Sequence, residues 1–542
     1  MRFIPLLIGA SLLCSALSTN AQAQGADDGA VPELDFTPRP IDYGPGPGVP
    51  LSPAAPAAEV AGMPAIAGAN ATGAFSQPLT WPLIPIHAIV LPDGRVLTYG
   101  TNENGAQGAR VVYEVWNPKD PVTPHTLLPN TLLTDFFCGA QSLLLGSGNA
   151  LLAGGDAIVN GVRNFSNDRT TIFDVTTNGL TDVQPTMLFR RWYATLVPLS
   201  YGSKLILGGR EDKGIATITP EVYDEATGWR TLFNATSDPA FGMTENHWYY
   251  PRAYQHPNDP GSVVYVTHNG DTYRIQPGGL GAITRLSPVA PKGDFRLPTA
   301  MYAPGKLLSV RKSQVAVAID INGPEPVITP VPNVNKPRFW STMAVLADGK
   351  VLLSGGSEVA NQLSGVTYDT QIWDPATGAW TTGASAAKPR LYHSIALLLP
   401  DATVLTGGGG VPGPVMQLNA EIYYPPYLYD ASGQPAARPL LLSAPPVVNA
   451  ALEPQFLATV ASGNQISRVT LVHTGSVTHS TNVEQRFQDL SFVQSGQTLV
   501  INSPTNPNYT VAGYYMLFAF NPQGVPSEAK IVKIRYGALA SG

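Results

Sequence analysis

The chain has 542 residues, a formal net charge of −6 and only 13% charged residues. This sparse and slightly acidic charge excludes the basic patches that bind nucleic acid or anionic membrane surfaces. We therefore expect a small-molecule partner, no nucleic-acid or membrane partner, and a monomer. The 53 Gly and 51 Pro residues exceed ordinary usage without a collagen period, so we attribute them to turns.

The N-terminus carries an export signal. Met1-Arg2 is followed by an apolar run over residues 3–17 and then by Ala21-Gln22-Ala23. The run is shorter than a membrane span needs, which predicts a signal peptide over residues 1–23 and a protein secreted to the periplasm or the extracellular medium. Its removal leaves Cys138 as the one cysteine of the mature chain. A lone cysteine in an oxidising compartment is either a buried, inert thiol or has a specific use.

Residues 24–77 are rich in Pro, Ala and Gly and show no periodicity, so we interpret them as an extended leader. From residue 78 to about 430 one unit recurs: a short apolar strand, a Gly-centred turn, a second apolar strand and often Gly-Gly. Seven copies start at His87, Gln141, Ala194, Arg252, Thr299, Ser341 and His393. Hairpins at this period, about 45 to 55 residues, predict a seven-bladed kelch-like β-propeller.

The repeat pattern ends by about residue 430. The later segments ISRVTLVHTG, QTLVINSP and GYYMLFAFNP are apolar and predict further short strands. They predict a C-terminal β-sandwich, immunoglobulin-like, over residues 431–542. Because no segment has the pattern of an amphipathic helix, the predicted class is all-β.

The familiar enzyme motifs are missing: the zinc helix, the nucleophile elbow, the phosphate loop and the dinucleotide fingerprint. Reactive residues stand instead just before repeat strands: Cys138 in FCGAQSLLL, Tyr193 in RRWYATL, and Tyr392 with His393 in RLYHS. Equivalent blade-entry positions of a propeller converge on one face, so these residues can meet in space. Taken alone, the pair Tyr392-His393 is weak evidence, because a packed or surface tyrosine and histidine explain it more readily.

One further histidine, His479, lies in the polar stretch THSTNVEQRF after the strand VTLVHTG. With FCG, RWYAT, RLYHS, NAEIYYPPYL and GYYMLFAFNPQGVPS, this stretch resembles the copper radical oxidases, the family of galactose oxidase and glyoxal oxidase. The matching pieces run from about residue 80 to 535 in the family's order.

The resemblance implies a ligand set and a cofactor. Cys138 and Tyr193 would form a thioether-linked pair, with Tyr193 also a copper ligand that holds the protein radical. His393 and His479 would be the other equatorial ligands and Tyr392 the axial one, around one copper ion. Two imidazoles with phenolate oxygens suit tetragonal Cu(II). In the family, a C-terminal hairpin enters the propeller to bring the last histidine to the metal.

The same resemblance implies a reaction. Tyr392 would accept the proton of a substrate hydroxyl, the Tyr193 radical would take a hydrogen from carbon, and O₂ would leave as hydrogen peroxide. Galactose oxidase carries a sugar-binding module and a tryptophan beyond the radical tyrosine, and neither is found here. We therefore expect small aldehydes of the glyoxal or methylglyoxal type to be oxidised to carboxylic acids, with oxidation of primary alcohols or galactose as the alternative.

Several assignments stay open in the sequence. Trp192, Trp248 and Trp340 are candidates for shielding the radical ring, and Arg338 for binding substrate oxygen. A non-catalytic kelch-like binding protein is the alternative class, since a fold does not dictate a function. A zinc- or calcium-dependent lyase lacks a carboxylate-rich ligand set.

Overall fold

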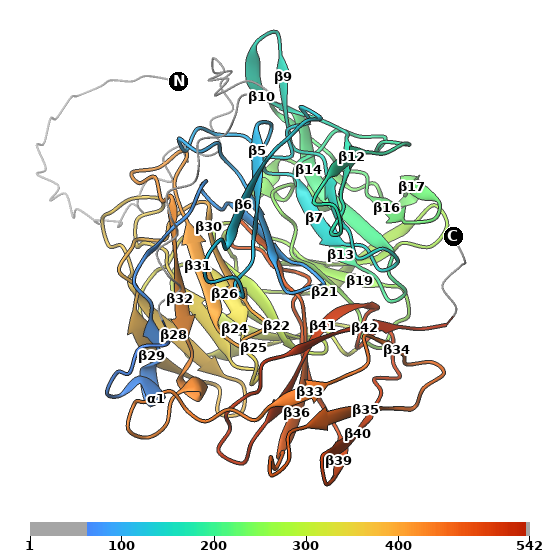
Figure 1. Cartoon of the computed structure of the whole chain (residues 1–542). Coiled ribbons are helices and arrows are strands. Elements are labelled where there is room, and N and C mark those ends of the chain that lie inside the picture. Colours follow the sequence, from blue (N-terminus) through green and yellow to red (C-terminus); the bar gives the residue numbers. More distant parts are fainter. Residues whose placement is uncertain (1–61, 538–542) are drawn as a thin grey trace, which may run out of the picture.

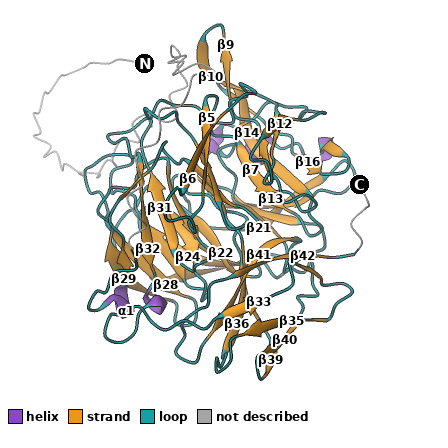
Figure 2. Ribbon diagram, viewed as in Figure 1, coloured by secondary structure: helices purple, strands orange, loops and turns teal. Residues whose placement is uncertain are grey.

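The computed structural model describes residues 62–537, and it confirms the predicted all-β class (Figures 1 and 2). The predicted signal peptide and residues 24–61 of the predicted leader lie outside the described residues. Helical elements in the described part are three or four residues long: α1 (Ala69–Thr72), η2 (Phe233–Ala235), α2 (Asp238–Phe241), η3 (Thr244–Asn246) and η4 (Pro426–Leu428). None of these helices has the length and apolar character needed to cross a membrane.

Each hairpin predicted from the repeats forms the first two strands of an antiparallel sheet, to which later strands add. The strands, sheet by sheet, are β3 (His87–Val90), β4 (Val96–Tyr99), β5 (Val112–Trp116) and β6 (His125–Pro129); β7 (Ala140–Leu143), β8 (Ala150–Ala153), β11 (Thr170–Phe173) and β12 (Leu180–Asp182); β13 (Trp192–Pro198), β14 (Lys204–Asp212), β16 (Glu221–Asp224) and β17 (Gly228–Thr231); β18 (Ala253–Gln255), β19 (Val263–Val266), β20 (Asp271–Gln276) and β21 (Ala282–Val289); β22 (Thr299–Ala303), β23 (Lys306–Val310), β24 (Ala316–Asp320) and β25 (Val327–Val331); β26 (Thr342–Val345), β27 (Val351–Ser354), β28 (Asp369–Asp374) and β29 (Ala379–Ser385); β30 (Ser394–Leu398), β31 (Val404–Gly408) and β32 (Asn419–Tyr424).

Short strands complete this arrangement. β1 (Ala74–Phe75) and β2 (Leu79–Thr80) pair with β32, so the segment before the repeats joins the last repeat sheet. β15 (Ile215–Ala216) extends the sheet of β14. A separate hairpin of β9 (Asp156–Val159) and β10 (Val162–Ser166) projects at the top of Figure 1.

The first strands of these sheets lie against one another. β3 contacts β7, β7 contacts β13, and β13 contacts β18; β22 contacts β26, β26 contacts β30, and β30 returns to β3. All residues of β3, β7, β13, β26 and β30 are buried, as expected for strands covered on both sides. Residues that immediately precede these first strands are thereby drawn together from distant parts of the sequence.

The C-terminal region adds two sheets. One contains β33 (Leu441–Ser443), β35 (Gln455–Val460), β39 (Phe492–Ser495) and β40 (Thr498–Asn502); the other contains β34 (Val447–Asn449), β36 (Arg468–His473), β38 (Phe487–Leu490), β41 (Gly513–Phe520) and β42 (Lys530–Arg535). Between β36 and β38 the chain leaves this region, and β37 (Ser476–Thr478) pairs antiparallel with β3. His479 directly follows β37 and thus reaches the repeat sheets.

Two buried histidines, His268 and His473, should make the stability of the fold depend on pH. Burial lowers the pKa of both His268 and His473, helped by Arg252 and Arg486 respectively. A histidine whose pKa is lower in the folded chain than its unfolded value of about 6.5 binds fewer protons when folded. Lowering the pH below about 6.5 therefore favours the unfolded chain, which takes up the proton. We therefore expect the free energy of unfolding of the protein to fall as the pH is lowered below about 6.5.

The variant His268→Gln isolates one of these contributions. Its amide can still donate to the Tyr249 carbonyl, which His268 Nε2 contacts at 3.0 Å, but it cannot take up a proton. Urea unfolding at a series of pH values should show a dependence shallower than that of the unsubstituted protein, by up to about 1.4 kcal/mol per pH unit. Parallel curves for the two proteins would contradict this expectation.

Candidate active site

The five residues singled out by sequence all lie in one buried cluster. Cys138 precedes β7, Tyr193 is the second residue of β13, Tyr392 and His393 precede β30, and His479 follows β37. Each has 2% or less of its surface exposed. Residues from four separate segments therefore share one enclosed space.

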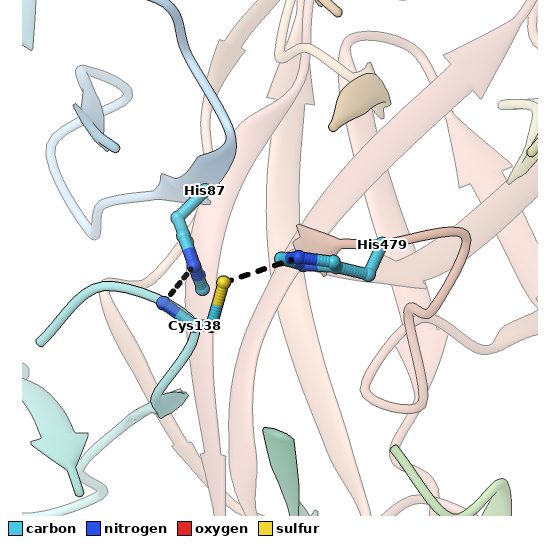
Figure 3. Close-up of side chains that lie close together, drawn as sticks. All are labelled: His87, Cys138 and His479. Atoms are coloured by element: carbon cyan, nitrogen blue, oxygen red, sulfur yellow. Dashed lines mark hydrogen bonds between the residues drawn. The ribbon is translucent and has the colours of Figure 1, made fainter. Parts of the chain in front are cut away.

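Cys138 stands at the centre of this cluster. Its Sγ lies 3.3 Å from Nε2 of His479 and 3.8 Å from Nε2 of His393. Figure 3 shows the sulfur directed towards the His479 ring. The Tyr193 amide donates to the Cys138 carbonyl at 2.8 Å, so these two residues are neighbours through their backbones as well.

The two tyrosines meet at their hydroxyl groups, which are 3.1 Å apart. Their rings pack against the histidines: the ring centroids are 3.7 Å apart for Tyr392 and His393, and 5.4 Å apart for Tyr193 and His479. The two imidazoles meet edge to face at 4.5 Å. Two oxygen donors and two nitrogen donors thus converge.

The backbone is strained at these positions. Cys138, Tyr193, His393 and His479 have φ values of 53°, 68°, 69° and 47°, in the left-handed region that side chains other than glycine rarely adopt. Each such residue costs on the order of 1–3 kcal/mol and persists where the surrounding structure holds it. The packing of the sheets therefore offsets an unfavourable backbone free energy at each of these four residues. Strained residues of this kind commonly cluster at functional sites.

Hydrogen bonds fix which nitrogen of each imidazole is free. His393 Nδ1 donates to the Gly410 carbonyl at 2.8 Å, which leaves the Nε2 lone pair available. Thr478 Oγ1 donates its hydrogen to the Ile86 carbonyl, so its contact with His479 Nδ1 requires that nitrogen to donate. Both Nε2 lone pairs are thus directed into the cluster.

Burial keeps the cluster uncharged in the absence of a cation. It lowers the pKa of His393 to about 3 and the pKa of His479 well below its usual value. It raises the pKa of the Cys138 thiol and of the Tyr193 phenol well above their usual values. A metal ion would reverse the preference of a phenol by stabilising its phenolate form.

The residues fit a copper ion. Two imidazole nitrogens with fixed tautomers and two phenol oxygens form a donor set that suits tetragonal Cu(II). Neutral histidines bind metal without first losing a proton. His393, His479, Tyr193 and Tyr392 would hold the ion.

The hairpin that carries His479 is anchored inside the repeat sheets. Gln485 forms two hydrogen bonds with the backbone of Val345, at 2.8 and 2.9 Å, and Glu484 accepts a hydrogen bond from Ser142. Gln141 donates to the Val477 carbonyl at 3.0 Å. These contacts hold a C-terminal segment at the site, as the resemblance implied.

Aromatic rings surround Tyr193. Trp192 and Tyr249 lie nearly parallel to its ring, with centroids 4.9 and 4.8 Å away, whereas Trp248 meets it edge to face at 5.8 Å. Trp340 instead packs on Tyr392. Sequence reasoning considered the three tryptophans but missed Tyr249, which stands next to Trp248 in the stretch HWYYP.

Stacking by Tyr249 should assist formation of a Tyr193 radical. An aromatic pair contributes about 0.5–1.5 kcal/mol beyond its buried area, so Tyr249→Leu should lower the radical yield by up to about tenfold at a fixed oxidant potential. The radical can be counted by its optical absorption and by spin resonance. Tyr249→Phe keeps the ring and serves as the control; equal losses in both variants would rule out a stacking effect.

Arg338 does not have the predicted role. It is fully buried, and its guanidinium binds Asp369 at 2.7 Å and Asn335 at 3.0 Å. A side chain that braces two neighbours in this way is not available to a substrate. His87 was not among the predicted site residues, yet its ligand atom and those of Cys138 and His479 lie within 4.8 Å of one another (Figure 3). A signal existed, since His87 begins the first repeat strand as His393 precedes the last one.

Comparison with known proteins points the same way. Residues 438–534 match the family model described as galactose oxidase-like, early set domain. Galactose oxidase of Gibberella zeae is 25% identical over 499 residues, covering 85% of this chain and 70% of that protein. Aldehyde oxidase GLOX of Vitis pseudoreticulata is 25% identical over 452 residues, covering 75% and 83%. A solved structure of a novel fungal alcohol oxidase of the AA5 family, in complex with copper, has a TM-score of 0.76 at 23% identity, covering 85% of this chain and 99% of that one.

The fold is similar to that of the copper-containing alcohol oxidase, and the C-terminal region is similar to the early set domain of galactose oxidase-like proteins. These similarities support the copper radical oxidase family and a copper-dependent oxidase. The resemblance predicted from the sequence is thereby confirmed.

Proposed function

We propose that the chain oxidises small aldehydes, as their hydrates, to carboxylic acids while reducing O₂ to hydrogen peroxide. The observation that carries this proposal is one buried cluster in which the Nε2 atoms of His393 and His479 lie 3.8 and 3.3 Å from Cys138 Sγ and the hydroxyl groups of Tyr193 and Tyr392 lie 3.1 Å apart. The reaction balances, because RCH(OH)₂ and O₂ contain the atoms of RCOOH and H₂O₂. Two electrons and two protons pass from the hydrate to oxygen.

Each residue has a chemical task in this proposal. Tyr392 accepts the proton of the substrate hydroxyl, and oxidised Tyr193 takes the hydrogen from the substrate carbon. The proximity of the two hydroxyl groups keeps both tasks at one place. A copper ion, when bound, supplies the second one-electron acceptor and stabilises phenolate. The surrounding aromatic side chains exclude water from the oxidised ring.

A thioether between Cys138 and Tyr193 completes the proposal. A bond from Sγ to a ring carbon replaces one S–H and one C–H bond, and the two electrons and two protons reduce O₂ to H₂O₂. The hydrogen bond of 2.8 Å from the Tyr193 amide to the Cys138 carbonyl supports this pairing. It gives the lone cysteine of the mature chain a use.

Enclosure of the site favours small substrates, because all five residues are nearly inaccessible. The plant aldehyde oxidase is matched over 83% of its length, whereas galactose oxidase is matched over 70%. Primary alcohols are the second candidate, since the matched fungal structure is that of an alcohol oxidase.

The remaining sequence assignments extend the proposal. The repeat sheets would be seven blades of one propeller over residues 78–430, and the two C-terminal sheets an immunoglobulin-like sandwich within residues 431–542. The run of contacts among first strands, from β22 through β26, β30, β3, β7 and β13 to β18, supports the first assignment. The export signal supports secretion after loss of residues 1–23, and we propose that the secreted protein is a monomer.

A substrate panel tests the proposed function. Copper-loaded, oxidised protein should release peroxide with methylglyoxal or glyoxal faster than with simple primary alcohols, and faster still than with galactose. Tyr193→Phe is the matched control, since it keeps the ring but loses the reactive oxygen. Galactose turnover well above aldehyde turnover would reverse the substrate assignment, and no peroxide from any of these compounds would refute the proposed function.

A further inference from the structure

His87 contacts the reactive cysteine directly. It is the first residue of β3, is fully buried, and its Nε2 accepts a hydrogen bond from the Cys138 amide at 3.1 Å (Figure 3). The neutral imidazole therefore carries its proton on Nδ1, which has no hydrogen-bond partner among the described residues. Because the Nε2 lone pair is already occupied, the geometry argues against His87 as a metal ligand despite its place beside Cys138 and His479.

The Cys138 amide needs such an acceptor. Cys138 is fully buried with a φ of 53°, so its N–H has neither water nor a regular strand partner. A buried donor left without a partner costs about 1–3 kcal/mol. The hydrogen bond from His87 thus stabilises the backbone conformation that directs Sγ into the cluster.

His87 is itself held on two sides. Its ring stacks on Tyr99, with centroids 4.4 Å apart and planes 10° apart, and Tyr99 donates to Gln141 at 2.7 Å. Its backbone pairs with Thr478, the residue before His479. Strand β3 therefore contacts both Cys138 and the segment that carries His479, and it fixes their positions relative to each other.

We propose that His87 is a positioning residue that orients Cys138 for formation of the carbon–sulfur bond with Tyr193. This inference rests on the thioether of the proposed function. The bond forms with loss of one S–H and one ring C–H, and O₂ takes up the two electrons and two protons as H₂O₂. His87 exchanges no atom or electron; it acts through the Cys138 backbone.

Two variants separate this role from a merely structural one. His87→Gln places an amide oxygen near the position of Nε2 and keeps an acceptor, whereas His87→Leu removes it. His256→Leu is the matched control, because His256 Nδ1 also accepts from backbone amides, at 3.0 and 2.9 Å, but outside this cluster. Thioether formation is timed after copper is added in air, from the loss of titratable thiol and of the mass of two hydrogen atoms.

We expect His87→Leu to form the thioether about two- to tenfold more slowly, the range set by one net hydrogen bond. His87→Gln and His256→Leu should form it at the unsubstituted rate. Amide hydrogen exchange at Cys138 in copper-free protein gives a second readout, and it should rise in His87→Leu alone.

An unchanged rate and unchanged exchange in His87→Leu would overturn the inference, as would a His87→Gln variant as impaired as His87→Leu. If the unsubstituted protein forms no thioether, the proposed cofactor fails. In that case, unchanged amide hydrogen exchange at Cys138 in His87→Leu overturns the inference about His87 as well. Faster exchange would show that His87 holds the Cys138 amide.

Discussion

Replacing Cys138 by Ser should abolish the covalent cofactor and lower turnover by about a hundredfold or more, as expected for a residue that takes part in the chemical step. Sulfur substitution of a phenol ring eases its oxidation, so the variant should need a higher potential to form the Tyr193 radical. Copper should still bind, because the four proposed ligands remain.

Three signatures distinguish the cross-linked chain from the variant. After copper loading in air, the unsubstituted chain should be lighter than its sequence requires by the mass of two hydrogen atoms. It should not react with thiol reagents when denatured, and it should migrate faster on denaturing gels because a loop of the chain is closed. Cys138→Ser should lack the mass loss and the faster migration. One titratable thiol in the denatured, copper-loaded protein would remove the thioether and the main support of the radical mechanism.

Replacing His393 or His479 by Ala should abolish stoichiometric copper binding. Each is buried, and a hydrogen bond at Nδ1 leaves its Nε2 lone pair to bind the ion. Activity should fall with copper content. Metal analysis and the spin-resonance spectrum of bound Cu(II) would measure the loss, and circular dichroism would show that the β-structure persists.

His473→Ala is the control for this pair. His473 is also buried and lies six residues before His479, but its Nδ1 donates to the Thr474 carbonyl at 2.7 Å and its ring packs against Tyr515 of β41. We expect this variant to keep its copper at temperatures below its unfolding midpoint. Full copper occupancy in both His393→Ala and His479→Ala would refute the ligand assignment.

The hairpins of the repeat region could be predicted because their signals are local. A Gly-containing turn between two apolar strands is encoded within about 15 residues, and all seven predicted copies form hairpins in the structure. The sequence also predicted that Cys138, Tyr193 and His393 lie at the starts of strands. Their grouping with His479 came from the resemblance, because no local pattern relates a C-terminal hairpin to the first repeat strand.

Other features depended on contacts that the sequence does not display. Tyr249 stacks on Tyr193 together with Trp192, and Arg338 is occupied by Asp369, because neighbouring sheets pack these side chains together. The sequence by itself determined the strand and turn pattern, the export signal and the reactive residue types. Only the tertiary structure decided that His87 holds the Cys138 amide, because 51 positions separate the two residues in the sequence. The packing of β3 against β7 brings His87 Nε2 to 3.1 Å from the Cys138 amide nitrogen.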